Sequence, residues 1–252
     1  MRSSVCLFVA SVVAATSSVH AGVTQIAYAS VTASGSEGFN AYAGPDWTQT
    51  TYNSIYSGSG MSFGKRFNGQ SLSVQTSGGD SFDRLNVGFE GATGPLSLLT
   101  GAANYNLAFL SRPGYGGTIL GGGPINGVTD GLGGFGRGSL AVLFDTDVST
   151  CGLKIIACNG GTAHFSFFRR DGSVIGSTSI TLAGDTTPFV TYTDALAFQS
   201  DTGASEIAGF SVWNTDPFGM TFDDFIYAGA AVPAPGAIAW LGMAGLMGRR
   251  RR

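Results

Sequence analysis

Apolar and polar side chains alternate along three stretches in the second half of the chain, as expected of strands with one buried face. The apolar positions are Leu140, Val142 and Phe144, then Ala163, Phe165 and Phe167, and later Ala208, Phe210 and Val212. A last strand is predicted at residues 220–227. The pair Asp171-Gly172 suits a tight turn with positive φ, and it predicts a hairpin that returns through residues 173–176.

The first half of the chain gives weaker signals. Strands are predicted at residues 23–33, 61–67 and 72–76, and residues 96–109 are ambiguous. Residues 114–138 form a glycine-dominated loop region with room for one short strand. Short strands separated by turn residues, with almost no helical periodicity, are typical of an antiparallel β-sandwich. We therefore predict an all-β fold of this kind.

Composition favours strands over helices. The 252 residues include 40 glycines, and glutamate and lysine are scarce. So much glycine is also compatible with disorder, but 43% of the residues are apolar and 18 are phenylalanine. Disordered chains lack such large side chains to bury. A folded β-domain is therefore favoured.

The first residues show the features of a secretory signal peptide in the right order. A Met-Arg start is followed by an apolar stretch at residues 5–15, and small residues occupy the minus-three and minus-one positions before Gly22. The alternative is a short buried N-terminal helix. We predict that residues 1–21 are removed and that the chain is exported.

The last residues form a segment in three parts. These parts are Val232, Pro233, Ala234 and Pro235, then the apolar run 236–248, then Arg249, Arg250, Arg251 and Arg252. A transmembrane helix takes about 20 apolar residues, so this one is short unless the proline segment lies partly inside the bilayer. The arginines are expected to keep the C-terminus cytoplasmic. The chain thus divides into a signal peptide at 1–21, a body at 22–230 and a tail at 231–252.

This tail resembles the PEP-CTERM sorting signal of bacteria that make extracellular polysaccharide. The two prolines, the apolar helix and the arginine cluster carry the resemblance, while Ala234 stands where the signal usually has Glu. The resemblance implies that a membrane cysteine protease of the exosortase type processes the tail. It also implies anchoring in the membrane through the C-terminal helix before processing. Afterwards the protein is expected at the cell surface or in an extracellular biofilm matrix, with polysaccharide as a partner.

The body resembles a group of exported proteins that carry the same type of tail. The resemblance lies in residues 62–70, 167–173, 207–217 and 222–225, which read SFGKRFNGQ, FFRRDGS, IAGFSVWNTDP and FDDF. It implies a lectin-like or galactose-binding-like sandwich of the jelly-roll type. No established activity comes with it.

Charge narrows the class of partner. Five of the 13 lysines and arginines lie in the two terminal segments, which leaves eight basic against 16 acidic residues and a body charge near −8. So acidic a body disfavours nucleic acids and anionic membrane surfaces. For the same reason neutral glycans are expected to bind better than acidic ones.

Catalytic motifs are weak. Residues 131–136 fit GxGxxG, but more glycine and a strand follow where a dinucleotide site requires a helix. Asp145-Thr146-Asp147 begins like a calcium loop, yet the glycine and the closing glutamate of such a loop are missing. His164 is the one histidine of the body, and no nucleophile motif accompanies it.

Paired carboxylates for glycoside hydrolysis are not singled out either. The glutamates are Glu37, Glu90 and Glu206, and most aspartates stand in turn contexts. We therefore assign no catalytic and no cofactor-binding residues.

A structural Ca²⁺ is one binding hypothesis. Asp223 and Asp224 stand on the last predicted strand, and Glu37 or Asp46 could add hard oxygen ligands from an early loop. The alternative is a solvent-facing strand residue beside a capping aspartate.

Aromatic stacking on sugar rings is a second hypothesis. Trp213, Trp47 and Tyr115 are the main candidates, with Tyr52 and Tyr56 beside them. Trp213 alternates with the apolar residues of its strand, so it is predicted to point away from the core. The alternative is that these rings pack in the interior.

Cys151 and Cys158 are predicted to be unpaired. Seven residues of strand span about 23 Å, whereas bridged Cα atoms lie roughly 4.4–6.8 Å apart. Export to an oxidising compartment favours a bond instead, which requires the chain to fold back between them.

The sequence thus predicts an exported, non-enzymatic β-sandwich that binds glycans or adheres to them. A purely structural matrix protein is the first alternative and a polysaccharide-active hydrolase the second. An aromatic-lined groove favours binding, a flat polar surface favours the structural role, and a buried carboxylate pair in a cleft favours the hydrolase.

Overall fold

The structure is a computed structural model of the chain. It describes residues 22–42, 44–85, 91–112, 116–123, 136–157, 159–184 and 192–229. The signal peptide and the C-terminal tail lie outside the described residues, as do Glu90, Tyr115, Cys158 and all of the glycine motif except Gly136. What the sequence predicts for these parts stays a prediction.

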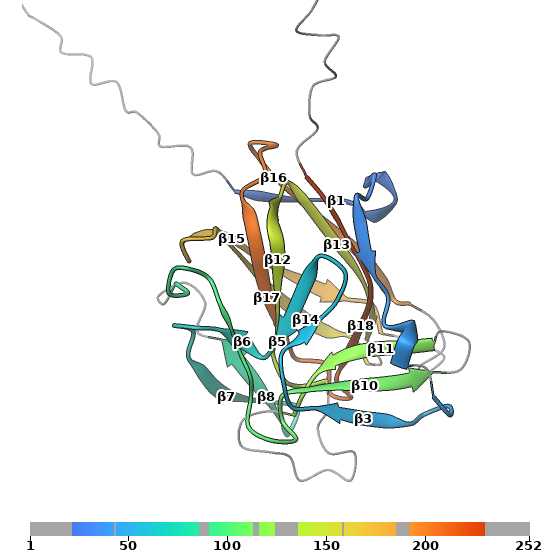
Figure 1. Cartoon of the computed structure of the whole chain (residues 1–252). Helices are drawn as coiled ribbons and strands as arrows, with labels where there is room; N and C mark the ends of the chain where they lie inside the picture. Colours follow the sequence, from blue (N-terminus) through green and yellow to red (C-terminus); the bar gives the residue numbers. More distant parts are fainter. Residues whose placement is uncertain are drawn as a thin grey trace, which may run out of the picture.

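The larger of two main antiparallel sheets has eight strands in the described part of the chain (Figure 1). Its order is β1 (Val23–Ala27), β16 (Asp194–Ser200), β13 (Thr150–Ala157), β18 (Met220–Ala228), β11 (Gly116–Gly121), β10 (Leu107–Arg112) and β3 (Gln49–Tyr52). The short strand β2 (Gly35–Glu37) pairs with β18 outside this order. Strands far apart in sequence are therefore neighbours in space.

The second main sheet has six strands. Its order is β15 (Val174–Leu182), β14 (Gly161–Phe168), β17 (Ile207–Asn214), β12 (Leu140–Val148), β5 (Met61–Gly64) and β4 (Tyr56–Ser57). The register places Phe165 opposite Val212 and Val142 opposite Phe210, so the apolar positions of neighbouring strands share one face. This sheet carries the groove described below.

The inner faces of the two sheets meet in one apolar core. Phe165 of the six-stranded sheet contacts Phe198 of the eight-stranded sheet, with ring centroids 5.0 Å apart. Both rings are buried. Burying a large apolar side chain contributes roughly 1.5–3 kcal/mol, so this shared core is what holds the sheets together.

A β-bulge interrupts β18. The register against β13 shifts between Gly152 and Lys154, and Asp224 has a φ of 45°. In a regular strand Phe222 and Phe225 would face opposite sides of the sheet, but the extra residue of the bulge turns both into the core.

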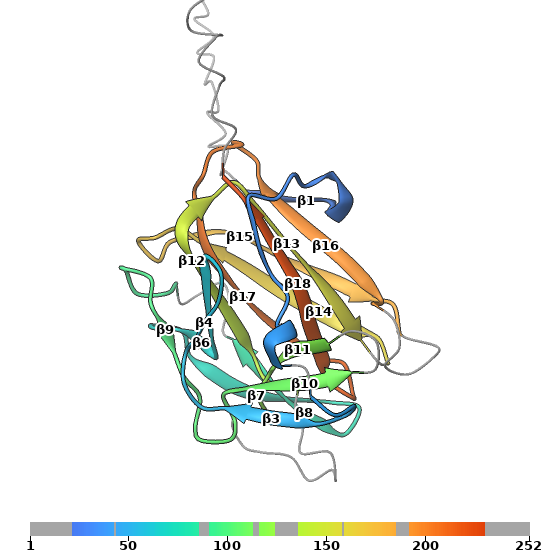
Figure 2. The same ribbon diagram turned by 45° about the vertical axis from the view of Figure 1, so that its right-hand side comes forward.

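Two small two-stranded sheets accompany the main ones (Figure 2). One joins β6 (Arg66–Phe67) to β9 (Leu98–Leu99), and the other joins β7 (Leu72–Ser77) to β8 (Asp80–Leu85). A second apolar cluster lies beside them, formed by Phe67, Phe168, Ala141 and Ala208 with Leu96. The strand β8 also contacts β17. The outer face of the six-stranded sheet is therefore partly covered.

The prediction of an all-β, antiparallel fold is confirmed, and the four strongest strand predictions correspond to β12, β14, β17 and β18. The hairpin after β14 is also present, but its turn is longer than predicted. Arg169 N–H donates to the Ser173 carbonyl, which leaves three residues in the turn. Gly172 has a φ of 84°, whereas Asp171 is not among the residues with positive φ.

The weaker predictions needed correction at their ends. The strand predicted at 23–33 stops at Ala27, where a 3₁₀ turn at Tyr28–Ser30 follows. The stretch 61–67 divides into β5 and β6, the ambiguous stretch 96–109 contains β9 and the start of β10, and the glycine-dominated region contains β11. Among the described residues, no helix is long and apolar enough to cross a bilayer.

Candidate functional site

Polar and aromatic side chains form two rows on the outer face of the six-stranded sheet. His164 of β14 is opposite Trp213 of β17 and Ser179 of β15. One step along, Ser166 is opposite a serine on each of the same two strands, Ser211 and Ser177. Because successive side chains of a strand point to opposite faces, this outer set follows directly from the inward positions of the phenylalanines.

The β7–β8 hairpin borders these rows and closes a groove of about 460 Å³. The sheet contributes Trp213, His164 and the serines of β15, while the hairpin contributes Gln75, Arg84 and Leu85. Of these, Arg84, Ser177 and Ser179 are exposed, and His164 and Gln75 are half-buried. The groove therefore offers polar side chains to solvent over an aromatic wall.

The aromatic wall is a stack of two rings. The Trp213 indole lies on the His164 imidazole with ring centroids 3.8 Å apart and an interplanar angle of 17°. Trp213 is only 7% exposed, and its Nε1 is buried without a hydrogen-bond partner among the residues that the structure describes. An unsatisfied buried donor costs roughly 1–3 kcal/mol, so folding alone gives no reason to keep an indole nitrogen at this position.

His164 is held as a neutral ring. Its Nδ1 lies 2.7 Å from the Ser179 hydroxyl oxygen. Burial lowers the pKa of His164 below 6.5, and the nearby charge of Arg84 lowers it further. At neutral pH the imidazole therefore carries no charge, so one of its nitrogens donates a hydrogen bond and the other accepts one.

A buried ion pair fixes the hairpin wall to the sheet. Lys65, between β5 and β6, lies 2.6 Å from an Asp83 carboxylate oxygen of β8, and both side chains are almost fully buried. Asp83 also accepts the Ser139 backbone N–H at 2.9 Å, and the Lys65 ammonium donates to the Gly123 carbonyl at 2.7 Å. Burial lowers the pKa of Lys65, although the nearby negative charge of Asp83 acts to raise it. The pair positions β8 and hence Arg84 and Leu85.

The structure separates the aromatic residues that the sequence grouped as sugar-stacking candidates. Trp213 points away from the core as predicted, but it is buried rather than exposed, because the hairpin wall covers it. Trp47 is 49% exposed, in a turn where its φ is 64°, and it is not part of the groove. Tyr52 and Tyr56 pack against the main core. Tyr115 lies outside the described residues.

The hypothesis of a calcium site at Asp223 and Asp224 finds no support in the geometry. The Lys154 ammonium lies 2.7 Å from an Asp224 carboxylate oxygen, so a side-chain cation already pairs with Asp224. Asp223 accepts the Tyr192 hydroxyl at 2.6 Å and the Asp224 backbone N–H at 2.8 Å. No group of three or more His, Cys, Asp or Glu side chains suited to a metal occurs in the part of the chain that the structure describes.

Glu37 is engaged elsewhere. Its carboxylate accepts the backbone N–H of Phe39 at 3.2 Å and that of Ser59 at 2.8 Å. It therefore fixes two loops to each other and does not join the aspartates of β18.

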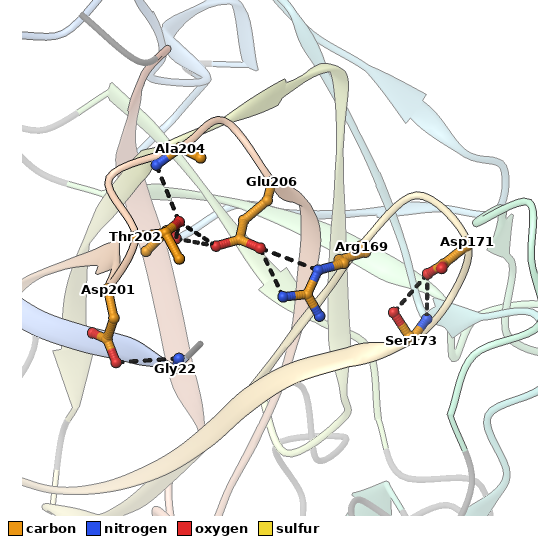
Figure 3. A network of polar contacts seen from close by, with 9 residues as sticks. Gly22, Arg169, Asp171, Ser173, Asp201, Thr202, Ala204 and Glu206 are labelled. Carbon is orange, nitrogen blue, oxygen red and sulfur yellow. Dashed lines mark hydrogen bonds and ion pairs between the residues drawn. The ribbon is translucent and has the colours of Figure 1, made fainter. Parts of the chain in front are cut away.

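Glu206 and Asp147 also form structural contacts. Glu206 accepts two bonds from the Arg169 guanidinium, at 3.1 and 2.7 Å, and a bond from the Thr202 hydroxyl at 2.6 Å (Figure 3). Asp147 pairs with Arg170 at 2.7 Å. The hairpin groove described above and two further hollows on the described surface are each lined by at most one carboxylate among their described residues, so none of these three has the pair expected of a glycoside hydrolase.

Cys151 is a free, buried thiol near the start of β13. Burial alone raises its pKa. This agrees with the prediction that Cys151 is unpaired, while Cys158 lies outside the described residues.

Sequence reasoning missed the hairpin side of the groove. Gln75 and Arg84 lie on β7 and β8, and β8 itself was not predicted. The alternating serines Ser177 and Ser179 on β15 were a usable signal, because polar residues at every second position mark the outer face of an edge strand.

Comparisons with known proteins assign the chain to no family. No family model matches it, and no curated protein matches it. Among solved structures, CsCBM6-3 from Clostridium stercorarium in complex with cellobiose is similar over 49% of this chain and 82% of that chain, at 15% sequence identity and a TM-score of 0.28. At this TM-score the likeness decides neither the fold nor the ligand of the present chain.

Proposed function

We propose that this protein is an exported, non-enzymatic glycan-binding protein and that it binds saccharide in the groove between the β7–β8 hairpin and the six-stranded sheet. The observation that carries the proposal is the Trp213–His164 stack, whose buried indole N–H lacks a partner at the wall of a polar groove. Unpaired buried donors are rare in folded proteins, and each asks for an explanation. The nitrogen has almost no exposed surface in the free groove, so a ligand acceptor reaches it through a rearrangement of the side chains around it and then supplies that explanation.

The groove suits a saccharide chemically. Sugar rings present hydroxyls around their edges and apolar C–H faces, so they need hydrogen-bonding side chains beside an aromatic surface. Arg84, Gln75 and the exposed serines Ser177 and Ser179 supply the hydrogen bonds, while the stacked rings of His164 and Trp213 supply the aromatic surface. Most of these groups stand on strands, which holds them in fixed positions before a ligand arrives.

Export is the second half of the proposal, and it rests on the sequence. The predicted signal peptide at 1–21 and the tail at 231–252, which resembles an exosortase substrate, both direct the body out of the cytoplasm. A glycan-binding body sorted by such a tail would serve as an adhesive component of the cell surface or the extracellular matrix.

Affinity gel electrophoresis tests the binding site. The full chain is run through gels that contain single polysaccharides, together with Trp213→Phe and Trp47→Phe. Trp213→Phe keeps a smaller aromatic ring and removes the unsatisfied N–H. The lost packing and the removed N–H act in opposite directions, so we expect its free energy of unfolding to change by less than about 1 kcal/mol. We expect this variant to lose most of the retardation, while Trp47→Phe, altered at the exposed tryptophan outside the groove, migrates like wild type.

Two results would contradict the proposal. If Trp47→Phe abolishes retardation and Trp213→Phe does not, saccharide binds outside the groove. If no polysaccharide in a panel of neutral and acidic polymers retards the wild-type chain, the protein is better explained as a structural matrix component.

A further inference from the structure

The charges at the groove differ from those of the whole body. The body carries a net charge near −8, since eight basic residues face 16 acidic ones between the two terminal segments. Among the described residues that line the groove, none is a carboxylate, and Arg84 is the one permanently charged side chain. The groove therefore carries local positive charge on a protein whose net charge is negative.

The Arg84 guanidinium is available for a ligand. Its side chain is exposed on β8, and it forms no ion pair with a carboxylate among the described residues, whereas Lys65, Arg137, Lys154, Arg169 and Arg170 each do. The adjacent residue Asp83 is fully buried and paired with Lys65. The strand β8 thus presents its cation to the groove and keeps its anion buried.

For a ligand in the groove, the nearby charge of Arg84 matters more than the net charge of the body. At physiological ionic strength the Debye length is about 8 Å, so the distant carboxylates of the body are largely screened from a ligand in the groove. A guanidinium within hydrogen-bonding distance of a carboxylate forms a charge-assisted contact that is roughly twice as strong as a neutral hydrogen bond. Binding preference is therefore set by Arg84 rather than by the total charge.

We propose that the groove binds an anionic sugar, with the carboxylate of a uronic acid or the sulfate of a sulfated sugar placed on Arg84 and the sugar ring over the His164–Trp213 stack. This inference rests on the proposed glycan-binding function and specifies its ligand class. It replaces the expectation that neutral glycans bind best, which took the net charge of the body as its only guide.

The test compares wild-type full chain with Arg84→Gln and Arg170→Gln in gels that contain polygalacturonate, a sulfated galactan or an uncharged glucan. Arg170 is the matched control, because it is a half-exposed arginine at the turn after β14 and its partner Asp147 lies outside the groove. We expect tighter retention by one of the anionic polymers than by the glucan, and the polymer that retains the chain identifies the anion. Arg84→Gln should weaken this retention about tenfold, while Arg170→Gln leaves it unchanged.

The outcomes separate this inference from the proposed function. Retention by the glucan alone, sensitive to Trp213→Phe, overturns the anionic ligand and keeps the glycan-binding groove. Retention by an anionic polymer that Arg170→Gln weakens as much as Arg84→Gln overturns the role of Arg84. Retention by none of the three polymers counts against both. A steep loss of retention between 50 and 200 mM salt, reduced in Arg84→Gln, supports the inference directly, because salt screens the contact between the two charges.

Discussion

At the residue scale, Asp223 is a carboxyl group whose ionisation the fold moves into the neutral pH range. Burial raises its pKa to about 7, although its hydrogen bonds with Tyr192 and the Asp224 N–H act in the opposite direction. The folded state therefore holds the proton more tightly than the unfolded state does. This contribution to stability is complete below about pH 4 and is lost as the pH rises to about 7.

Asp223→Asn removes this titration and keeps the size of the side chain. We expect the free energy of unfolding of wild type, relative to the variant, to fall by on the order of 1–3 kcal/mol between pH 5 and pH 8, as one pKa unit corresponds to about 1.4 kcal/mol. Urea unfolding of both proteins at several pH values measures the difference. His164, whose lowered pKa acts in the opposite sense, cancels in this comparison. A difference that stays constant from pH 5 to pH 8 would show that Asp223 is ionised throughout.

Trp213 shows how much of the environment of a single residue could be predicted from the sequence. Its position in the alternating pattern correctly predicted that it points away from the core. The pattern of β17 contains no information about what covers the outer face, and there β8 buries the indole to 7% exposure. Trp213→Ala is therefore expected to destabilise the protein by about 3–5 kcal/mol, as truncation of a buried ring does.

At the scale of elements, the β7–β8 hairpin is held by the buried pair of Lys65 and Asp83. Asp83→Asn leaves the Lys65 ammonium buried without its counter-charge, and breaking a buried pair in this way destabilises by about 3–5 kcal/mol. Asp147→Asn is the matched control, because the pair of Asp147 with Arg170 is about one-third exposed on both sides. We expect less than about 1 kcal/mol for the control.

Urea unfolding of the two variants measures this contrast, and hydrogen exchange of β7 and β8 amides localises it. We expect the Asp83→Asn hairpin to exchange faster than that of wild type. Equal losses of stability in the two variants would mean that the buried pair does not anchor the hairpin.

Strands that carry their own apolar alternation were predictable, and the others were not. β12, β14 and β17 each bury a regular set of large side chains against the facing sheet, so their pattern is visible in one segment. β8 is different, because it buries the charged residue Asp83 beside Phe82 and Leu85. The burial of this charge is explained only by the ion pair with Lys65, which the sequence of β8 does not contain. The bulge in β18 likewise depends on the register against β13, which no single segment contains.

At the scale of the whole molecule, the described chain begins and ends at the same end of the sandwich (Figure 1). The Gly22 N–H donates to an Asp201 carboxylate oxygen at 3.1 Å (Figure 3), and the Ala228 carbonyl accepts the Ser149 N–H at 2.9 Å. The β7–β8 hairpin lies toward the other end in Figures 1 and 2. A chain anchored through its tail would thus present the groove away from the anchor.

Processing at the two ends can be read from the mature protein. We expect the surface protein to begin at Gly22 and to lack Arg249–Arg252, as the predicted signal peptide and sorting tail imply. Intact-mass and peptide mass spectrometry of surface and matrix fractions from a host with an exosortase measures both ends. Retention of the four arginines on surface protein would contradict tail cleavage, and a body found only in the cytoplasm would contradict export.

The indole N–H signal of Trp213 during a glycan titration tests most directly whether saccharide binds in the groove. The chain has three tryptophans, so the ¹⁵N-labelled protein gives three indole signals, and Trp213→Phe assigns the one in the groove. We titrate the full chain with oligomers of the polysaccharide that retains it in gels. We expect the Trp213 signal to shift to saturation while the Trp47 signal stays in place. Saturable binding that moves the Trp47 signal and leaves Trp213 unchanged would contradict the assignment of the groove as the glycan site.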